Sequence, residues 1–163
     1  MQLTNISDYI HDALVDMRYT TDNNIIGRPI SDELEPRLVP SAALALGRVA
    51  DDLRDQGYRL VIWDAYRTPE VQKLLVNDVH DQRYVLLESK HCLGLALDLT
   101  LALLDGELLD MGTDHDDFTE LAHVDTDDIR EEQQYNRQLL AQAMQRQGFE
   151  QWPYEWWHFD YEQ

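Results

Sequence analysis

The feature that most constrains this fold is a pair of short strings far apart in the chain, S-K-H-C-L-G-L-A-L-D ending at Asp98 and E-W-W-H ending at His158. The first string contributes His91 and Asp98, and the second contributes Glu155 and His158. Two imidazoles and one carboxylate can hold Zn2+, and a second carboxylate beside the last imidazole can activate a water on the metal. The pattern therefore predicts a fold that brings the two strings to one point.

Each string must depart from regular strand geometry before its residues can converge. His91 and Asp98 are seven positions apart, so on an ideal strand, where side chains alternate, they would face opposite ways. Gly94 lies between them and can take the backbone angles that a bend or bulge requires. Glu155 and His158 also have opposite parity, which predicts that one of them lies off the regular strand, at its start.

The rest of the chain predicts helices and strands that mix without strict alternation. Apolar stripes next to proline or glycine predict three helices, over 40–57, about 69–76 and about 129–147. β-branched, aromatic or alternating segments predict three strands, over 58–63, 95–100 and 154–161. Arg67 then falls just past the end of a strand. We expect an α+β domain with a small, mostly antiparallel central sheet flanked by helices.

The size and charge of the chain narrow its class. A chain of 163 residues, 44% of them hydrophobic, is the size of one compact domain, and we expect a single domain over 1–163. Its 13 basic and 32 acidic residues give a formal charge of -19, which would repel nucleic acids and anionic membranes. We therefore expect no nucleic acid and no membrane among its partners.

The cysteine content limits the kind of metal site, and the N-terminal sequence indicates the cellular location. Cys92 is the single cysteine, which excludes an internal disulfide framework and a cysteine-rich zinc site. No stretch approaches the ~20 apolar residues that cross a bilayer, and the N-terminal residues lack a basic segment followed by an apolar one. The sequence predicts a cytoplasmic protein that binds zinc through histidine and carboxylate.

Taken singly, the candidate residues also have ordinary structural interpretations. A histidine before a strand is commonly a surface or hydrogen-bonded residue, and a lone carboxylate commonly caps a turn. Four further histidines have no comparable partners in the sequence and are left out of the ligand set: His11, His80, His115 and His123. The acidic run 114–128 is typical of a solvated loop, because it lacks the glycine and terminal glutamate of an EF-hand.

The joint pattern is more specific than its parts. S-x-H-x-x-G-x-A-x-D followed by E-x-W-H resembles the zinc D,D-peptidase family, which includes the D-alanyl-D-alanine dipeptidases associated with vancomycin resistance, related D,D-carboxypeptidases and the hedgehog-like zinc fold. Further segments resemble the dipeptidase branch, namely D-M-R-Y-T-T, W-D-A-Y-R-T-P, D-L-T-L, M-G-T-D-H-D and N-R-Q-L-L before G-F-E. The resemblance covers nearly the whole chain.

The resemblance implies a role for each motif residue. His91, Asp98 and His158 correspond to the ligands of one zinc ion, and Glu155 corresponds to the general base. Arg67 corresponds to the arginine that stabilises the transition state. The implied activity is hydrolysis of a D-Ala-D-Ala-type dipeptide by a zinc-activated water.

The resemblance also implies a pocket that recognises a small dipeptide. Asp116 and Tyr19 match positions that shape this pocket, and Ser89 begins the first motif and lies near the substrate. A free dipeptide carries an ammonium and a carboxylate, and Asp116 is a reasonable partner for the ammonium. A pocket closed around both charges would reject longer peptides.

Two alternatives stay open. The motif of the family is often S-x-H-S-R-G, but in this chain Cys92 and Leu93 replace its second serine and its arginine. The segment G-L-A-L-D is closer to the sequence of the carboxypeptidase branch. A D,D- or L,D-carboxypeptidase that trims peptidoglycan stems is therefore the nearest alternative. The second is a catalytically silent zinc-binding module. Glu155 and Arg67 favour a hydrolase, because a binding module needs the metal only for folding.

Overall fold

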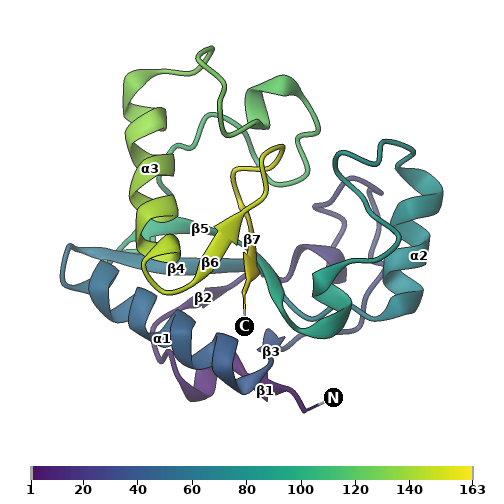
Figure 1. The fold of residues 1–163 in the computed structure, drawn as a ribbon, viewed down its shortest axis with the longest axis horizontal. Helices are drawn as coiled ribbons and strands as arrows, with labels where there is room; N and C mark the ends of the chain where they lie inside the picture. Colours follow the sequence, from purple (N-terminus) through teal and green to yellow (C-terminus); the bar gives the residue numbers. More distant parts are fainter. Residues whose placement is uncertain (1, 163) are drawn as a thin grey trace.

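Strand β5 (Ala96–Leu103) lies at the centre of a five-stranded sheet with the order β2-β4-β5-β7-β6 (Figure 1). The structure is a computed structural model that describes residues 2–162. The other strands of the sheet are β2 (Leu14–Val15), β4 (Tyr58–Asp64), β6 (Phe149–Gln151) and β7 (His158–Tyr161). The pair β2–β4 is parallel and the other neighbouring pairs are antiparallel. The predicted α+β class with a small, mostly antiparallel sheet is confirmed.

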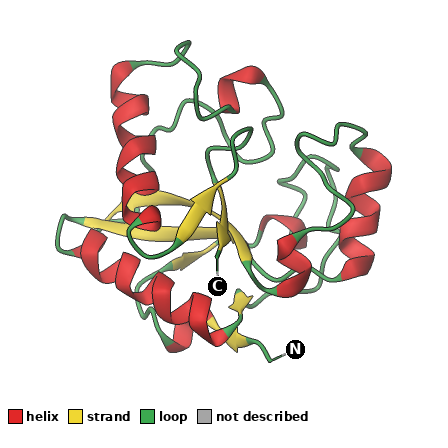
Figure 2. Cartoon of the chain, in the orientation of Figure 1, coloured by secondary structure: helices red, strands yellow, loops and turns green. Residues whose placement is uncertain are grey.

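Two helices form a layer against this sheet, and a third lies apart. Helix α1 (Pro40–Arg54) contacts β4, helix α3 (Glu131–Gln145) contacts β5 and β6, and the two helices touch each other. Helix α2 (Pro69–Asp78) is separated from the sheet by loops (Figure 2). A second, two-stranded sheet pairs β1 (Thr4–Asn5) with β3 (Arg37–Leu38). None of the helices within residues 2–162 is long and apolar enough to cross a bilayer.

The helices begin close to where the sequence predicts and end earlier or later by a few residues. Pro69 occupies the first turn of α2, and the Thr68 hydroxyl caps the helix by accepting a hydrogen bond from the Val71 N–H. The predicted helix 40–57 ends at Arg54, because residues 55–57 form a turn in which Gly57 has φ +93°. Helix α3 is two residues shorter at each end than the predicted 129–147.

The core divides into two apolar clusters. The main cluster fills the space between the sheet and the layer of α1 and α3, and its fully buried side chains include Leu46, Leu53, Leu99 and Phe159. A smaller cluster lies beneath α2 and comprises Tyr19, Val71, Leu75, Tyr84 and Val85. Polar groups that lie between the clusters are therefore shielded from water on two sides.

The predicted bend at Gly94 is present. Residues Lys90–Leu93 form one turn of 3-10 helix, and Gly94 follows with φ +64° and ψ +28°, a left-handed conformation that L side chains rarely adopt. A Cβ built at Gly94 would lie 2.4 Å from Leu3 Cδ2. This turn sets His91, which is buried, at an angle to β5.

The predicted strand 154–161 is wrong over its first half. β7 begins only at His158, and the residues before it form tight turns in which the Glu155 N–H donates to the Trp152 carbonyl. Pro153 has no N–H to give to a strand ladder. The prediction that Glu155 or His158 lies off the strand is confirmed, with Glu155 in the turn and His158 at the first strand position.

The antiparallel neighbours β4 and β5 are joined by a long segment, residues 65–95, that carries α2 and the 3-10 turn. The two ends of this segment are tied to each other. His91 Nδ1 donates to the Ala65 carbonyl at 2.6 Å, and the Arg67 N–H donates to the His91 carbonyl at 3.3 Å. These bonds form a neck at the base of the segment, beside the ends of β4 and β5.

Candidate active site

Three neighbouring strands place their polar residues side by side at one end of the sheet. A bulge in β4 shifts the register between Ile62 and Asp64, so that Asp64 pairs with Asp98 on β5. Asp98 in turn pairs with His158 on β7. The neck of segment 65–95 adds His91 to this row. Side chains that the sequence separates widely thus converge where these strands meet the turn.

Three donor atoms converge in this row. His158 Nδ1 lies 3.0 Å from Asp98 Oδ1 and 3.2 Å from His91 Nε2, and His91 Nε2 lies 3.4 Å from Asp98 Oδ1. Four donors at about 2.0–2.1 Å around a tetrahedral Zn2+ stand about 3.3 Å apart, so the three separations fit one face of such a site. Two nitrogens and one oxygen are also a donor set that zinc accepts. The chain therefore has a candidate metal centre at His91, Asp98 and His158.

The partners of the other ring nitrogens support this assignment. His91 donates from Nδ1 to the Ala65 carbonyl, which leaves Nε2 to face the donor cluster. His158 Nε2 lies 3.0 Å from Asp160 Oδ1, which leaves Nδ1 to face it. A carboxylate or carbonyl behind each histidine fixes ring orientation and strengthens the donor, as in other metal sites.

The same carboxylates control protonation at the cluster. Burial disfavours the charged ring of His158, but Asp160 and Asp98 outweigh it and raise the pKa of His158 to about 10. Burial would raise the pKa of Asp98, yet the charge on His91 and the surrounding imidazole hydrogen bonds hold that pKa well below its ordinary value. A proton and a metal ion therefore compete for His158 Nδ1.

Glu155 lies beside the donors without joining them. Its side chain is buried, and its Oε2 is 4.0 Å from His158 Nδ1. Burial is the main cause that raises the pKa of Glu155 to about 8, with Asp98 acting in the same direction and His158 against it. A carboxyl group with a pKa near neutrality can accept and return a proton at ordinary pH.

Arg67 is buried and held from several sides. Its Nε and Nη2 donate to Asp64 Oδ2 at 2.9 and 2.7 Å, and its Nη1 donates to Gln72 Oε1 at 2.6 Å. The guanidinium also lies over the Tyr19 ring, 4.9 Å from its centroid, and 3.8 Å from Asp98 Oδ2. The result is a fixed positive charge beside the donor cluster.

Asp116 and Tyr19 meet at the other side of the cluster. The Tyr19 hydroxyl donates to Asp116 Oδ1 at 3.0 Å, and the Ile25 N–H donates to Asp116 Oδ2 at 3.1 Å. Asp116 has φ +61°, the one non-glycine positive φ found in the described part of the chain. Burial and the Asp116 charge raise the pKa of Tyr19 well above its ordinary value, so its hydroxyl keeps the proton it donates.

His115 contacts Asp98 and Asp116 behind the donor cluster, although the sequence analysis left it out of the ligand set. Its Nε2 lies 3.1 Å from Asp98 Oδ2 and 3.5 Å from Asp116 Oδ1, and its Nδ1 is buried with no hydrogen-bond partner among residues 2–162. Burial disfavours the charged ring, but Asp116 and Asp98 raise the pKa of His115 to about 9. The sequence offered no visible partner for His115, because Asp98 is distant from it along the chain. Its place next to Asp116 was the available signal.

Apart from Asp64 and His115, the side chains of this cluster line one pocket of about 220 Å³. All eight residues that the sequence singles out lie on its wall: Tyr19, Arg67, Ser89, His91, Asp98, Asp116, Glu155 and His158. The Ser89 hydroxyl accepts a hydrogen bond from the His91 N–H at 3.3 Å and thereby caps the turn that carries His91. The pocket is also walled by Tyr84, Phe118 and Trp152.

Comparison with known proteins gives consistent matches. Residues 1–163 match the profile of peptidase family M15, described as D-ala-D-ala dipeptidase. A D-alanyl-D-alanine dipeptidase of Escherichia coli is 33% identical over 162 residues, covering 98% of this chain and 84% of that protein. One of Streptomyces coelicolor is 32% identical, covering 88% and 83%, and one of Enterococcus faecium is 29% identical, covering 96% and 89%.

Proposed function

This chain belongs to peptidase family M15, the D-Ala-D-Ala dipeptidases, and we propose that it hydrolyses D-Ala-D-Ala-type dipeptides with one Zn2+ held by His91, Asp98 and His158. The observation that carries this proposal is the convergence of metal donors, a buried carboxyl group and a buried guanidinium on one small pocket. Zn2+ in such a site supplies a Lewis acid that activates water and polarises a carbonyl group.

Glu155 is the base in this proposal. Its carboxylate stands near the donors and accepts the proton of the attacking water, then passes that proton to the leaving amine. With a pKa raised to about 8 by burial, the group holds the proton between the two steps. Positive charge at the donor cluster favours the ionised form that begins the reaction.

Arg67 stabilises the charge that develops on the carbonyl oxygen. Asp64 and Gln72 hold all three guanidinium nitrogens in place before substrate arrives, so little reorganisation is needed during the reaction. The burial of Arg67 strengthens its effect, because water screens it poorly.

Asp116 and Tyr19 recognise the free ammonium of the dipeptide. Asp116 is buried and already accepts two hydrogen bonds, and it faces the same pocket as the donors. An ammonium brought there forms a charge-assisted hydrogen bond, which is stronger than a neutral one. Ser89 lies at the same wall and is our third substrate contact.

The two residues that differ from the common family motif, Cys92 and Leu93, lie outside this pocket. Cys92 and Leu93 line a neighbouring groove together with Pro69 and Lys73. The Leu93 side chain is exposed. The groups that surround the donors are thus the same ones that the dipeptidase interpretation requires, which favours a dipeptidase over a carboxypeptidase.

One assay tests this function directly. Release of D-Ala from D-Ala-D-Ala is measured with and without a chelator, alongside the metal content of the protein. We expect about one Zn2+ per chain and loss of both metal and activity in His91→Ala and His158→Ala. Full activity in a verified metal-free preparation would overturn the proposal. A cytoplasmic location is part of the proposal, and cell fractionation tests it.

A further inference from the structure

The pocket is rich in acidic side chains, which suit the ammonium of a zwitterionic dipeptide but not its carboxylate. Its acidic lining residues are Glu88, Asp98, Asp116, Glu155 and Asp160. Among the lining residues that the structure describes, the lysine and arginine side chains are Arg67 and Lys90. A substrate carboxylate inserted among these acids needs one of the two cations as a partner.

Three of the five N–H groups of Arg67 are engaged, and the proposed function uses the remaining two for the charge that develops on the carbonyl oxygen. Its Nε and Nη2 bond to Asp64, its Nη1 bonds to Gln72, and its side chain is buried. Lys90 is different, because its ammonium pairs with Asp160 at 3.4 Å and with Glu162, and its side chain is 37% exposed. Lys90 is thus the cation that can turn toward a ligand.

The contacts also place Lys90 and Asp116 at opposite ends of one chain of polar groups. From one end to the other the order is Asp116, His115, Asp98, His158, Asp160 and Lys90. The metal donors Asp98 and His158 occupy the middle of this chain. A dipeptide with its scissile bond at the donors therefore meets a negative group on the side of its amine and a positive group on the other side.

We propose that Lys90 binds the C-terminal carboxylate of the substrate, so that the pocket recognises both charged ends of a free dipeptide. This inference rests on the proposed function and names the residue that selects for a free carboxylate. Glu162 is half exposed, and an ion pair in that setting contributes little. The substrate carboxylate takes the place of Glu162 on the ammonium, while Asp160 stays with His158.

The test compares two substrates that differ in one charge, D-Ala-D-Ala and its C-terminal amide. Lys90→Met keeps the length of the side chain and removes the ammonium. We expect KM for the free dipeptide to rise about tenfold to a hundredfold, from loss of a charge-assisted hydrogen bond, with kcat little changed. We expect KM for the C-terminal amide to be the same in Lys90→Met and in the unaltered enzyme. Lys90→Arg restores most of the preference for the free acid.

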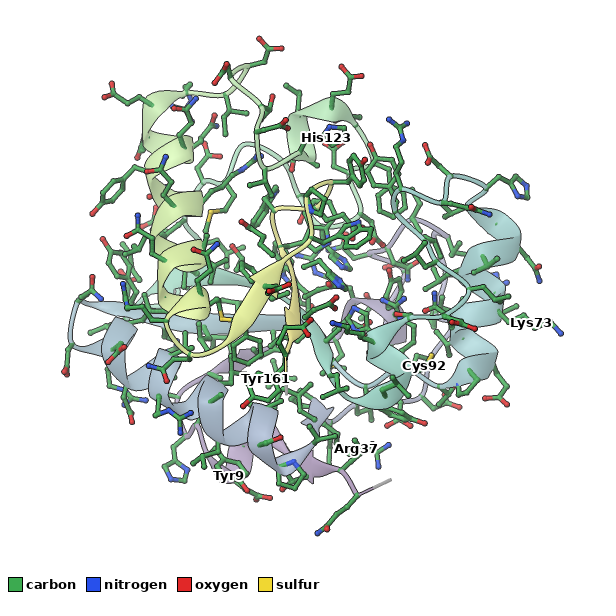
Figure 3. The ribbon with its side chains drawn as sticks, in the orientation of Figure 1. Tyr9, Arg37, Lys73, Cys92, His123 and Tyr161 are labelled. Carbon is green, nitrogen blue, oxygen red and sulfur yellow. The ribbon has the colours of Figure 1, made fainter. Side chains whose placement is uncertain are left out.

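The second lysine of the chain supplies a matched control. Figure 3 shows Lys73 pointing outward from α2, away from the body of the protein. Lys73→Met removes the same charge and leaves both KM values unchanged. An equal loss with both substrates in Lys90→Met, or no loss with either, would overturn the inference.

A binding measurement separates this inference from the proposed function. We expect the Glu155→Gln variant to turn the dipeptide over on the order of 10²–10⁴ times more slowly, so calorimetry on this variant reports affinity for the intact dipeptide. We expect the Glu155→Gln, Lys90→Met double variant to bind the free dipeptide about tenfold or more weakly. Equal affinity of the two proteins, or no binding to either, overturns the role of Lys90. Failure of the proposed function instead appears as no hydrolysis of D-Ala-D-Ala by the unaltered enzyme.

Discussion

The imidazole Nε2 of His115 lies 3.1 Å from Asp98 Oδ2, the carboxylate oxygen that does not contact His91 or His158. The other oxygen of Asp98, Oδ1, faces the donor cluster. One oxygen of the Asp98 carboxylate thus faces the donor cluster, and the other contacts His115. This contact fixes the rotation of Asp98 about its last bond, which sets the direction of its ligand oxygen.

We predict that His115→Phe weakens metal affinity by about tenfold to a hundredfold while the fold is kept. Phenylalanine fills the same space among Trp63, Tyr19 and Trp157 but cannot hold Asp98. Competition with a chromophoric chelator measures the affinity. The matched control is His123→Phe, because His123 also packs on aromatic rings yet bonds to Tyr84. Unchanged affinity in His115→Phe would contradict this role.

The second prediction separates catalysis from metal binding. Glu155→Gln should keep the zinc and the fold and lower kcat by a factor on the order of 10²–10⁴, because the amide cannot take a proton. Metal analysis and steady-state kinetics on the same preparation check both parts. If the variant loses its metal, Glu155 is a ligand and the assignment as base fails.

The third prediction concerns the ammonium end of the substrate. N-acetyl-D-Ala-D-Ala should be a poor substrate, because the acyl group leaves Asp116 without its charged partner, at a cost of roughly 2 kcal/mol or more. Asp116→Ala should narrow the difference between free and capped dipeptides, mainly by slowing the free one. Comparable hydrolysis of acylated peptides or pentapeptides by the unaltered enzyme would instead favour the carboxypeptidase alternative.

The fourth prediction concerns pH and the metal-free protein. The folded pKa values of His115 and His158, about 9 and about 10, exceed the ordinary value of 6.5, so the folded state holds protons that the unfolded state has released. Stability from these groups is complete below about pH 6.5 and is lost as pH rises through 9 to 10. Glu155, with a folded pKa of about 8 against 4.5, acts in the same direction at lower pH.

Thermal unfolding in a chelator should therefore show a lower midpoint at pH 9 than at pH 6.5. Zinc should raise the midpoint more at pH 9, because fewer protons then compete for His158 Nδ1. A metal-free midpoint that is flat or rises over this range would show that the buried imidazoles are not charged. Substitution of His115 by phenylalanine should flatten part of the slope.

Sequence analysis predicted site residues well where their positions depend on the neighbouring residues in the chain. It predicted them poorly where their positions depend on the register between distant strands. Gly94 predicted the bend before β5, and the parity of Glu155 and His158 predicted that one of the two lies off the strand. The family resemblance then supplied the residues that line the pocket. His115 and Asp64 were missed, because their partners are set by a bulge and by pairing between distant segments.

The smallest strands were also beyond prediction. β1, β2 and β3 have two residues each, which is too short for alternation to appear, and β6 has three. Their positions follow from tertiary pairing, such as Leu14 with Val61, rather than from local preference. The wrong strand prediction for residues 154–157 has the same origin. Aromatic residues are typical of strands, but here Trp156 and Trp157 lie in turns and are buried by tertiary packing.

The hydrogen bonds that tie Ala65 and Arg67 to His91 join the two ends of segment 65–95, so this segment is a closed loop on the sheet, called here the cassette. Its outer part, with α2 and the loop up to residue 88, can lengthen, shorten or change side chains while the neck still delivers His91 to Asp98 and His158. Evolution can therefore vary one wall of the pocket at constant metal geometry. Substrate range in relatives should diverge first in this cassette, and grafting it between relatives should transfer preference without loss of zinc.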